Sequence, residues 1–165
     1  MRTAFALATL AAVSIIAGCD GSTTDADHGS AKETIAMNYD EASRIVVENF
    51  TLVWPDPIQV EPNMVDRGNG CRTNPETLKS EGPPWTPIYE KGVTDPSQEF
   101  IDRALAQLEA MTGRGFTLRP DPIPDDDPIN RVYADSRGFT VAVRRDKLPA
   151  EIRFTVTSSS PCVND

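Results

Sequence analysis

Apolar residues first recur at helical spacing in the region that follows residue 30. The repeating positions, three or four apart, are Ile35, Tyr39, Ala42, Val46 and Phe50. This spacing predicts an amphipathic helix whose apolar stripe faces a core. Ser30 and Glu33 have the spacing of a capping box and predict a start near residue 30, while Asn38 and Glu41 offer a later start.

A second helix is predicted between residues 95 and 113. Its apolar face consists of Phe100, Ile101, Ala104, Leu105, Leu108 and Met111. Asp95 is expected to cap the helix, Pro96 fits the first helical position, and Gly113 marks the end.

Four segments rich in aromatic or β-branched residues follow the second helix. They are residues 115–119, 131–134, 139–144 and 152–157. The last two alternate between apolar and polar positions, as strands with one buried face do. We therefore expect an α+β fold in which two helices pack on one face of an antiparallel sheet of about four strands.

Residues 51–94 have a different pattern, because prolines and glycines interrupt every apolar run. Proline donates no backbone hydrogen bond and fixes φ, so only short edge strands are expected here, at residues 51–54 and 88–89. The segment is otherwise predicted to be one long Pro/Gly-rich loop.

The first nineteen residues have the order of an export signal. Arg2 precedes an uncharged run of about 13 residues, shorter than the roughly 20 that a membrane-spanning helix needs. The run ends in Ile16-Ala17-Gly18-Cys19, which resembles the lipobox of bacterial lipoproteins.

The resemblance to lipoproteins implies that the Cys19 thiol carries diacylglycerol and that residues 1–18 are removed. The protein would then hang from the outer face of the plasma membrane, with the membrane as its first partner. The alternative is an incidental cysteine beside an ordinary cleavage site. We expect a flexible tether over residues 19–30 and a single α+β domain over 31–165, in the general style of small actinobacterial surface lipoproteins.

Charge narrows the range of partners. Removal of residues 1–18 takes away Arg2 and no acid, which leaves 15 bases against 25 acids and a formal charge of −10. Such a surface repels polyanions, so a nucleic-acid partner is not expected.

With Cys19 assigned to lipid, Cys71 and Cys162 are the two cysteines that remain. In an exported chain such a pair predicts a disulfide. A redox pair or a metal site is the alternative, but the chain has no C-x-x-C motif, and no histidine lies near either cysteine.

Catalytic signatures are scarce. His28, the single histidine, lies on the predicted tether, and the motifs of nucleophilic, zinc-dependent and phosphate-binding enzymes are absent from the sequence. Paired carboxylates are the remaining route to catalysis, since two acids alone can cut a glycoside. No cofactor is expected.

The acidic run DPIPDDDPIN, residues 121–130, contains a candidate calcium site. Its oxygen donors would be Asp125, Asp126, Asp127 and Asn130. The EF-hand pattern is not met, and three prolines favour a solvated connector between strands instead.

Three aromatic residues in or beside the Pro/Gly-rich region are candidate contacts with a partner or ligand. They are Trp54, Trp85 and Tyr89. Exposed aromatics on a rigid loop bind sugar rings or protein partners, whereas buried ones would close an end of the core.

The sequence thus predicts a non-enzymatic, lipid-anchored binding domain whose partner is an envelope protein or a glycan. A small carrier of lipid or another apolar ligand is the first alternative. A carboxylate-dependent envelope enzyme is the second.

Overall fold

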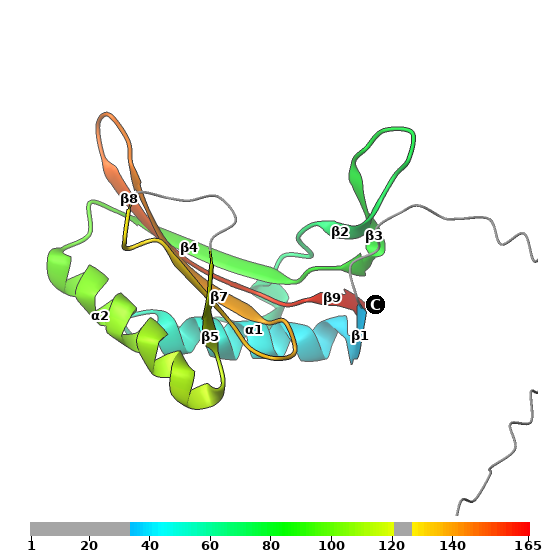
Figure 1. The fold of residues 1–165 in the computed structure, drawn as a ribbon, viewed down its shortest axis with the longest axis horizontal. Coiled ribbons are helices and arrows are strands. Elements are labelled where there is room, and N and C mark those ends of the chain that lie inside the picture. Colours follow the sequence, from blue (N-terminus) through cyan, green and yellow to red (C-terminus); the bar gives the residue numbers. More distant parts are fainter. Residues whose placement is uncertain (1–33, 121–126) are drawn as a thin grey trace, which may run out of the picture.

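The structure, a computed structural model, describes residues 34–120 and 127–165 and folds them into two β-sheets and two α-helices (Figure 1). The α-helices are α1 (Tyr39–Val53) and α2 (Gln98–Ala110), and two short 3₁₀ helices are η1 (Pro62–Met64) and η2 (Met111–Arg114). The strands are β1 (Thr34–Asn38), β2 (Gly70–Thr73), β3 (Ser80–Trp85), β4 (Ile88–Thr94), β5 (Thr117–Arg119), β6 (Arg131–Ala134), β7 (Thr140–Lys147), β8 (Ile152–Ser159) and β9 (Cys162–Asn164).

The larger sheet has five strands in the order β4-β8-β7-β6-β5, and every neighbouring pair is antiparallel. The four strands expected after the second helix correspond to β5 to β8. The fifth strand, β4, comes from the region expected to be mostly loop. The α+β class and the two helices are confirmed, and the structure adds a fifth strand and a second sheet.

Both α-helices cover the same face of this sheet. In α1, Phe50 contacts Tyr89 of β4 edge-on, and in α2, Phe100 meets Phe154 of β8 in the same way. Phe154 pairs with Val93 in β4, which is four residues from Tyr89 and therefore on the same face. The fully buried side chains of the two helices and of β7 and β8 form one core.

Helix α1 begins at the later of the two predicted starts. Asn38 is its N-cap, and the side-chain oxygen of Asn38 accepts a hydrogen bond from the backbone N–H of Glu41 at 2.9 Å. Ile35, which the periodicity placed on the helix, lies instead in β1. Ser30 and Glu33 lie outside the described residues.

The strand expected at residues 88–89 is confirmed as part of β4, whereas the strand expected at residues 51–54 and the long loop are wrong. Helix α1 continues to Val53, and three strands follow before α2. Strand β3 contains Pro83 and Pro84 because its pairing with β2 is interrupted there: Glu81 pairs with Arg72, the register then shifts, and the next pair is Trp85 with Gly70. The two prolines therefore occupy positions where no ladder hydrogen bond is needed.

The N-cap of helix α2 lies two residues after the predicted cap, Asp95. Ser97 is the N-cap, and its hydroxyl accepts from the backbone N–H of Phe100 at 3.1 Å. The carboxylate of Asp95 instead accepts from the backbone N–H of Ile152 at 2.8 Å, which ties the start of the helix to β8.

The smaller sheet has the order β1-β9-β3-β2 and lies at the end of the domain where α1 begins (Figure 1). Strand β1 runs parallel to β9, and the other pairs are antiparallel. Since β1 leads directly into α1, this sheet and the first turn of α1 together form the surroundings of the candidate site.

Candidate functional site

Two adjoining cavities open at the N-terminal end of α1. The first has a volume of about 400 Å³ and is lined by Tyr39, Asp40, Arg44, Glu61, Pro62, Asn63 and Val65. The second, of about 310 Å³, is lined by Asn38, Tyr39, Asp40, Arg67 and Asp165. Both volumes fall in the range of small-ligand pockets. Tyr39 and Asp40 belong to both cavities, and we call the combined surface the Tyr39 groove.

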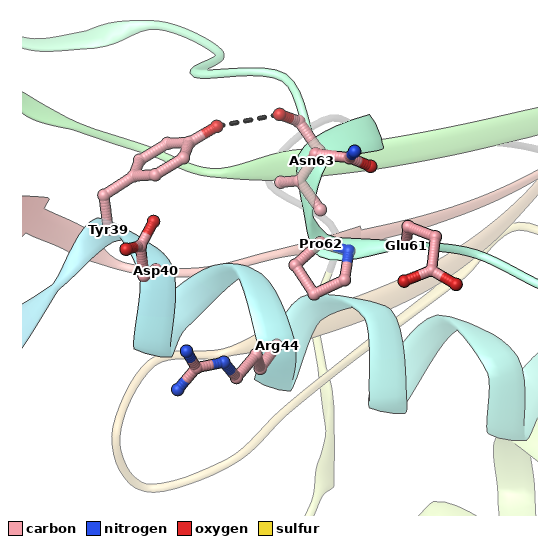
Figure 2. Close-up of a pocket in the computed structure, with 7 residues that line it drawn as sticks. Tyr39, Asp40, Arg44, Glu61, Pro62 and Asn63 are labelled. Carbon is pink, nitrogen blue, oxygen red and sulfur yellow. Dashed lines mark hydrogen bonds between the residues drawn. The ribbon is translucent and has the colours of Figure 1, made fainter.

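Tyr39 is fixed at both ends of its side chain. Its backbone is the first residue of α1, directly after the Asn38 cap. Its hydroxyl donates to the carbonyl oxygen of Val65 at 2.7 Å, a bond that closes one end of the first cavity (Figure 2). The ring is therefore a rigid, half-buried surface between the two cavities.

Arg67 contacts three of the residues in and around the second cavity. Its guanidinium carbon lies 5.1 Å from the centroid of the Tyr39 ring and 5.6 Å from that of Trp85. Its Nη1 atom donates to the Asp165 carboxylate in an ion pair whose two side chains are about half exposed. Each exposed contact of this kind contributes about 1 kcal/mol or less, so Arg67 mainly positions the residues around it.

The first cavity has charged groups on both walls. Asp40 and Arg44 lie one turn apart on the same side of α1, while Glu61, Pro62 and Asn63 come from the segment that faces the helix (Figure 2). The charged side chains are exposed. The groove thus offers carboxylate acceptors and guanidinium and amide donors around the apolar surfaces of Tyr39 and Pro62.

Trp85 lies at the border of this groove and is partly buried. Its indole packs against the backbone of Gly82, because a Cβ atom built on Gly82 would lie 2.6 Å from two atoms of the ring. Arg67 contacts the same indole, so the ring does not form an open stacking platform. The indole Nε1 atom is buried, with no hydrogen-bond partner in the described part of the chain.

The other two aromatic candidates lie elsewhere. Trp54 is 6% exposed and packs against Phe50 and Phe100, so it belongs to the core and cannot be a contact surface. The reason is its position at the C-cap of α1, which directs the indole under α2. Tyr89 is half-buried against Phe50 on the helix-covered face of the larger sheet. The structure therefore assigns Trp85 and Tyr89 to different sheets.

The disulfide between Cys71 and Cys162 is confirmed. It joins β2 to β9 with a Cα–Cα distance of 6.0 Å and spans 91 residues of sequence. Strand β9 also pairs with β3 at Val163 and Trp85, and Asp165 directly follows it. The disulfide consequently fixes the strands that supply Trp85 and Asp165 to the groove.

Of the candidate calcium residues that the structure describes, Asp127 binds cationic side chains of the protein itself, and Asn130 binds a backbone N–H. Asp127 is 9% exposed, and both of its oxygens accept from the Arg145 guanidinium, at 2.8 and 2.9 Å. Lys147 lies 3.3 Å from the same carboxylate, and Asn130 accepts from the backbone N–H of Arg145. Asp125 and Asp126 lie outside the described residues. Over residues 34–120 and 127–165, no group of three or more His, Cys, Asp or Glu side chains has a metal-binding arrangement.

Opposing influences act on the pKa of Asp127. Burial raises it, but the hydrogen bonds from the Ile129 N–H, Arg145 and Lys147, together with the charge of Arg145, outweigh burial and hold the pKa below its usual value. The carboxylate is therefore ionised at neutral pH and links the start of β6 to β7.

Cys19, the lipobox residues 16–18 and the predicted tether lie outside the described residues. Within the described ranges, no helix has the length and apolar character required to cross a membrane.

Comparison of the chain with protein families, with curated proteins and with solved structures finds no match in any of the three.

Sequence reasoning missed most of the Tyr39 groove. It placed Tyr39 on the apolar stripe of a helix and found no role for Arg44, Glu61, Arg67 or Asp165. A partial signal was present, since a hydroxyl-bearing aromatic directly after an N-cap is well placed to reach beyond its helix. The remaining groove residues come together only in the folded chain, from α1, from η1 and the segment around it, and from the end of β9.

Proposed function

We propose that the chain is a lipid-anchored, non-enzymatic binding domain of the cell envelope, attached to the outer face of the plasma membrane through Cys19. The Tyr39 groove is its ligand site. One observation carries this proposal: the Tyr39 ring is fixed between two adjoining cavities by its bond to Val65 and its contact with Arg67. A preorganised surface loses little conformational entropy on binding.

The chemistry of the groove favours a glycan as the ligand. Sugar hydroxyls both donate and accept hydrogen bonds, and the first cavity supplies acceptors from Asp40 and Glu61 and donors from Arg44 and Asn63. The faces of Tyr39 and Pro62 can contact the C–H surface of a sugar ring. A long apolar ligand is less suited to a groove with this many charged groups, which argues against the carrier alternative.

The proposal is tested by isothermal titration calorimetry, in which soluble peptidoglycan fragments are added to the full chain carrying Cys19→Ser and the dissociation constant is measured. We expect saturable binding, and we expect Arg44→Ala to weaken it about tenfold, the loss of a charge-assisted hydrogen bond. Lys79→Ala, a change at an exposed hairpin residue outside the groove, is the matched control and should leave the affinity unchanged. Absence of binding, or equal affinity of the two variants, would overturn the proposal.

One observation favours a second candidate function. Asp40 and Glu61 line the same cavity from opposite walls, and glycoside hydrolysis requires two carboxylates on either side of the scissile bond. The two functions are separated by incubating the protein with the same fragments and measuring new reducing ends. A binding domain releases none. An enzyme releases them in wild type and loses this activity in both Asp40→Asn and Glu61→Gln.

A further inference from the structure

The face of the larger sheet that points away from the helices carries two complete rows of side chains. The first row, in strand order, is Glu90, Thr157, Ala142, Val132 and Arg119. The second row is Ile88, Ser159, Thr140, Ala134 and Thr117. The intervening row includes Tyr89 and Val141, which pack in the core, so alternation along each strand directs these two rows outward.

These two rows have a distinct pattern of charge. Every position between the two edges is uncharged and small or β-branched. The only charged residues of the two rows are Glu90 at one edge and Arg119 at the other, about 19 Å apart across four strand spacings. Glu90 accepts a hydrogen bond from Thr157 at 3.1 Å, and over the described ranges neither Glu90 nor Arg119 has an ion-pair partner.

We propose that this face binds the same face of a second copy of the chain, as a two-fold dimer. An axis that runs parallel to the strands along β7 exchanges the two edges of the sheet. It places Glu90 opposite the partner's Arg119 and, by symmetry, Arg119 opposite the partner's Glu90. Ala142 lies on the axis, where its short side chain permits two sheets to pack at about 10 Å.

The remaining charges on this face lie toward the turn between β7 and β8. Arg144 and Asp146 of β7 form an ion pair at 2.7 Å, and Arg153 lies on β8 beside them. Arg144 lies two residues from Ala142 on β7, so it faces its own copy close to the axis. This like-charge contact weakens the dimer, and the uncharged rows supply the attractive contacts at the centre.

The size of the face predicts a weak dimer. The two rows span five strands and about four residues of length, because β5 and β6 have only three and four residues, which gives roughly 300 Å² on each copy, below the size of a stable interface. Two copies anchored in the same membrane are held at a high effective concentration, which favours association without added contacts. None of the groove residues belongs to the two rows, so the dimer presents two open grooves and does not depend on the proposed ligand.

The test is sedimentation velocity of the full chain carrying Cys19→Ser, at low ionic strength and over about 5–200 μM, the range for an interface of this size. We expect a concentration-dependent dimer. Glu90→Arg and Arg119→Glu each replace two attractive contacts by repulsive ones and should each raise the dissociation constant about tenfold. The double variant restores opposite charges in both contacts and should restore the dimer.

Lys79→Glu changes the net charge as much as Glu90→Arg does, in magnitude, but lies outside the face, so it should leave the dimer intact. A chain that remains monomeric at every concentration would overturn the proposal. The face would then be covered by solvent, by residues 19–33 or by another protein. A dimer that neither single variant weakens, or that the double variant fails to restore, would overturn it as well.

Discussion

The hydroxyl of Tyr39 and the carbonyl oxygen of Val65 are joined by a 2.7 Å hydrogen bond across 26 residues of sequence. This bond connects the first residue of α1 to the segment that forms the opposite wall of the groove. Tyr39 also lies under the Arg67 guanidinium, so one side chain touches both cavities. The shape of the groove therefore depends on a single tyrosine more than on any charged residue that lines it.

Tyr39→Phe removes this hydrogen bond and keeps the ring. Because the Val65 carbonyl loses a partly buried partner, we expect the free energy of unfolding to fall by about 1 kcal/mol, measured by urea denaturation. Peptidoglycan fragments should also bind more weakly, since the ring is no longer fixed. Thr51→Val, which removes a hydroxyl bonded within α1 and outside the groove, should leave binding unchanged. Unaltered stability and affinity in Tyr39→Phe would contradict this role.

Gly82 is expected to control the position of the Trp85 indole. A methyl group at residue 82 would overlap the ring, so Gly82→Ala should displace the indole and destabilise the fold by about 1–3 kcal/mol. The tryptophan fluorescence should shift, because Trp85 moves while Trp54 stays in the core. Gly92→Ala is the matched control, since its new Cβ would meet only ordinary contacts beginning at 3.5 Å. Identical spectra for the two variants would disprove the packing.

Loss of the disulfide should destabilise the smaller sheet and the groove. The bridge spans 91 residues, and removal of a native disulfide of this kind lowers the free energy of unfolding by about 2–5 kcal/mol. We expect Cys71→Ser with Cys162→Ser to show this loss in urea. Reduction of wild type should have the same effect, and reduction of the double variant should have none. A double variant as stable as the oxidised protein would contradict the prediction.

The ion pair between Asp127 and Arg145 makes stability depend on pH. The pKa of Asp127 is lower in the folded protein than its usual value of 3.8, so its stabilising contribution is fully present above that value. It is lost as the pH falls from about 4 through the lowered pKa. Asp127→Asn should be about 2–3 kcal/mol less stable at pH 7 and should lose less stability on acidification. Parallel pH profiles of the two proteins would show that Asp127 is not linked to folding.

Cys19 is predicted to provide the membrane anchor. Cys19→Ser should release or misprocess the protein, because the thiol that carries the diacylglycerol is gone, and the Cys71–Cys162 disulfide should still form. Fractionation and electrophoresis without reductant measure the two properties separately. Membrane attachment that survives the substitution unchanged would refute the lipobox interpretation.

The sequence predicted the parts of the fold that depend on local pattern. Helix α2 and strands β6 to β8 follow from the spacing of their apolar residues, and the disulfide follows from the number of cysteines in a chain that is predicted to be exported. The strands between residues 70 and 94 could not be predicted in this way. Pro83 and Pro84 forbid regular pairing, and β3 exists because the register shifts where they lie.

The groove was harder to predict than the fold. Trp85 was named from its sequence context, and the structure places it beside Arg67. The groove itself depends on contacts between distant residues, such as Tyr39 with Val65 and Arg67 with Asp165. No periodicity in the sequence encodes these contacts, because they join residues that lie 26 and 98 positions apart along the chain.

The central claim, that the Tyr39 groove contacts an envelope ligand, is tested most directly by photo-crosslinking in living cells. A benzophenone amino acid replaces Asn63, an exposed residue that lines the groove, and in a control strain it replaces Glu99, which is exposed on α2. We expect light to crosslink peptidoglycan to the protein that carries the probe at position 63. The protein that carries the probe at position 99 should not be crosslinked. Equal crosslinking at the two positions, or none at position 63, would contradict the account.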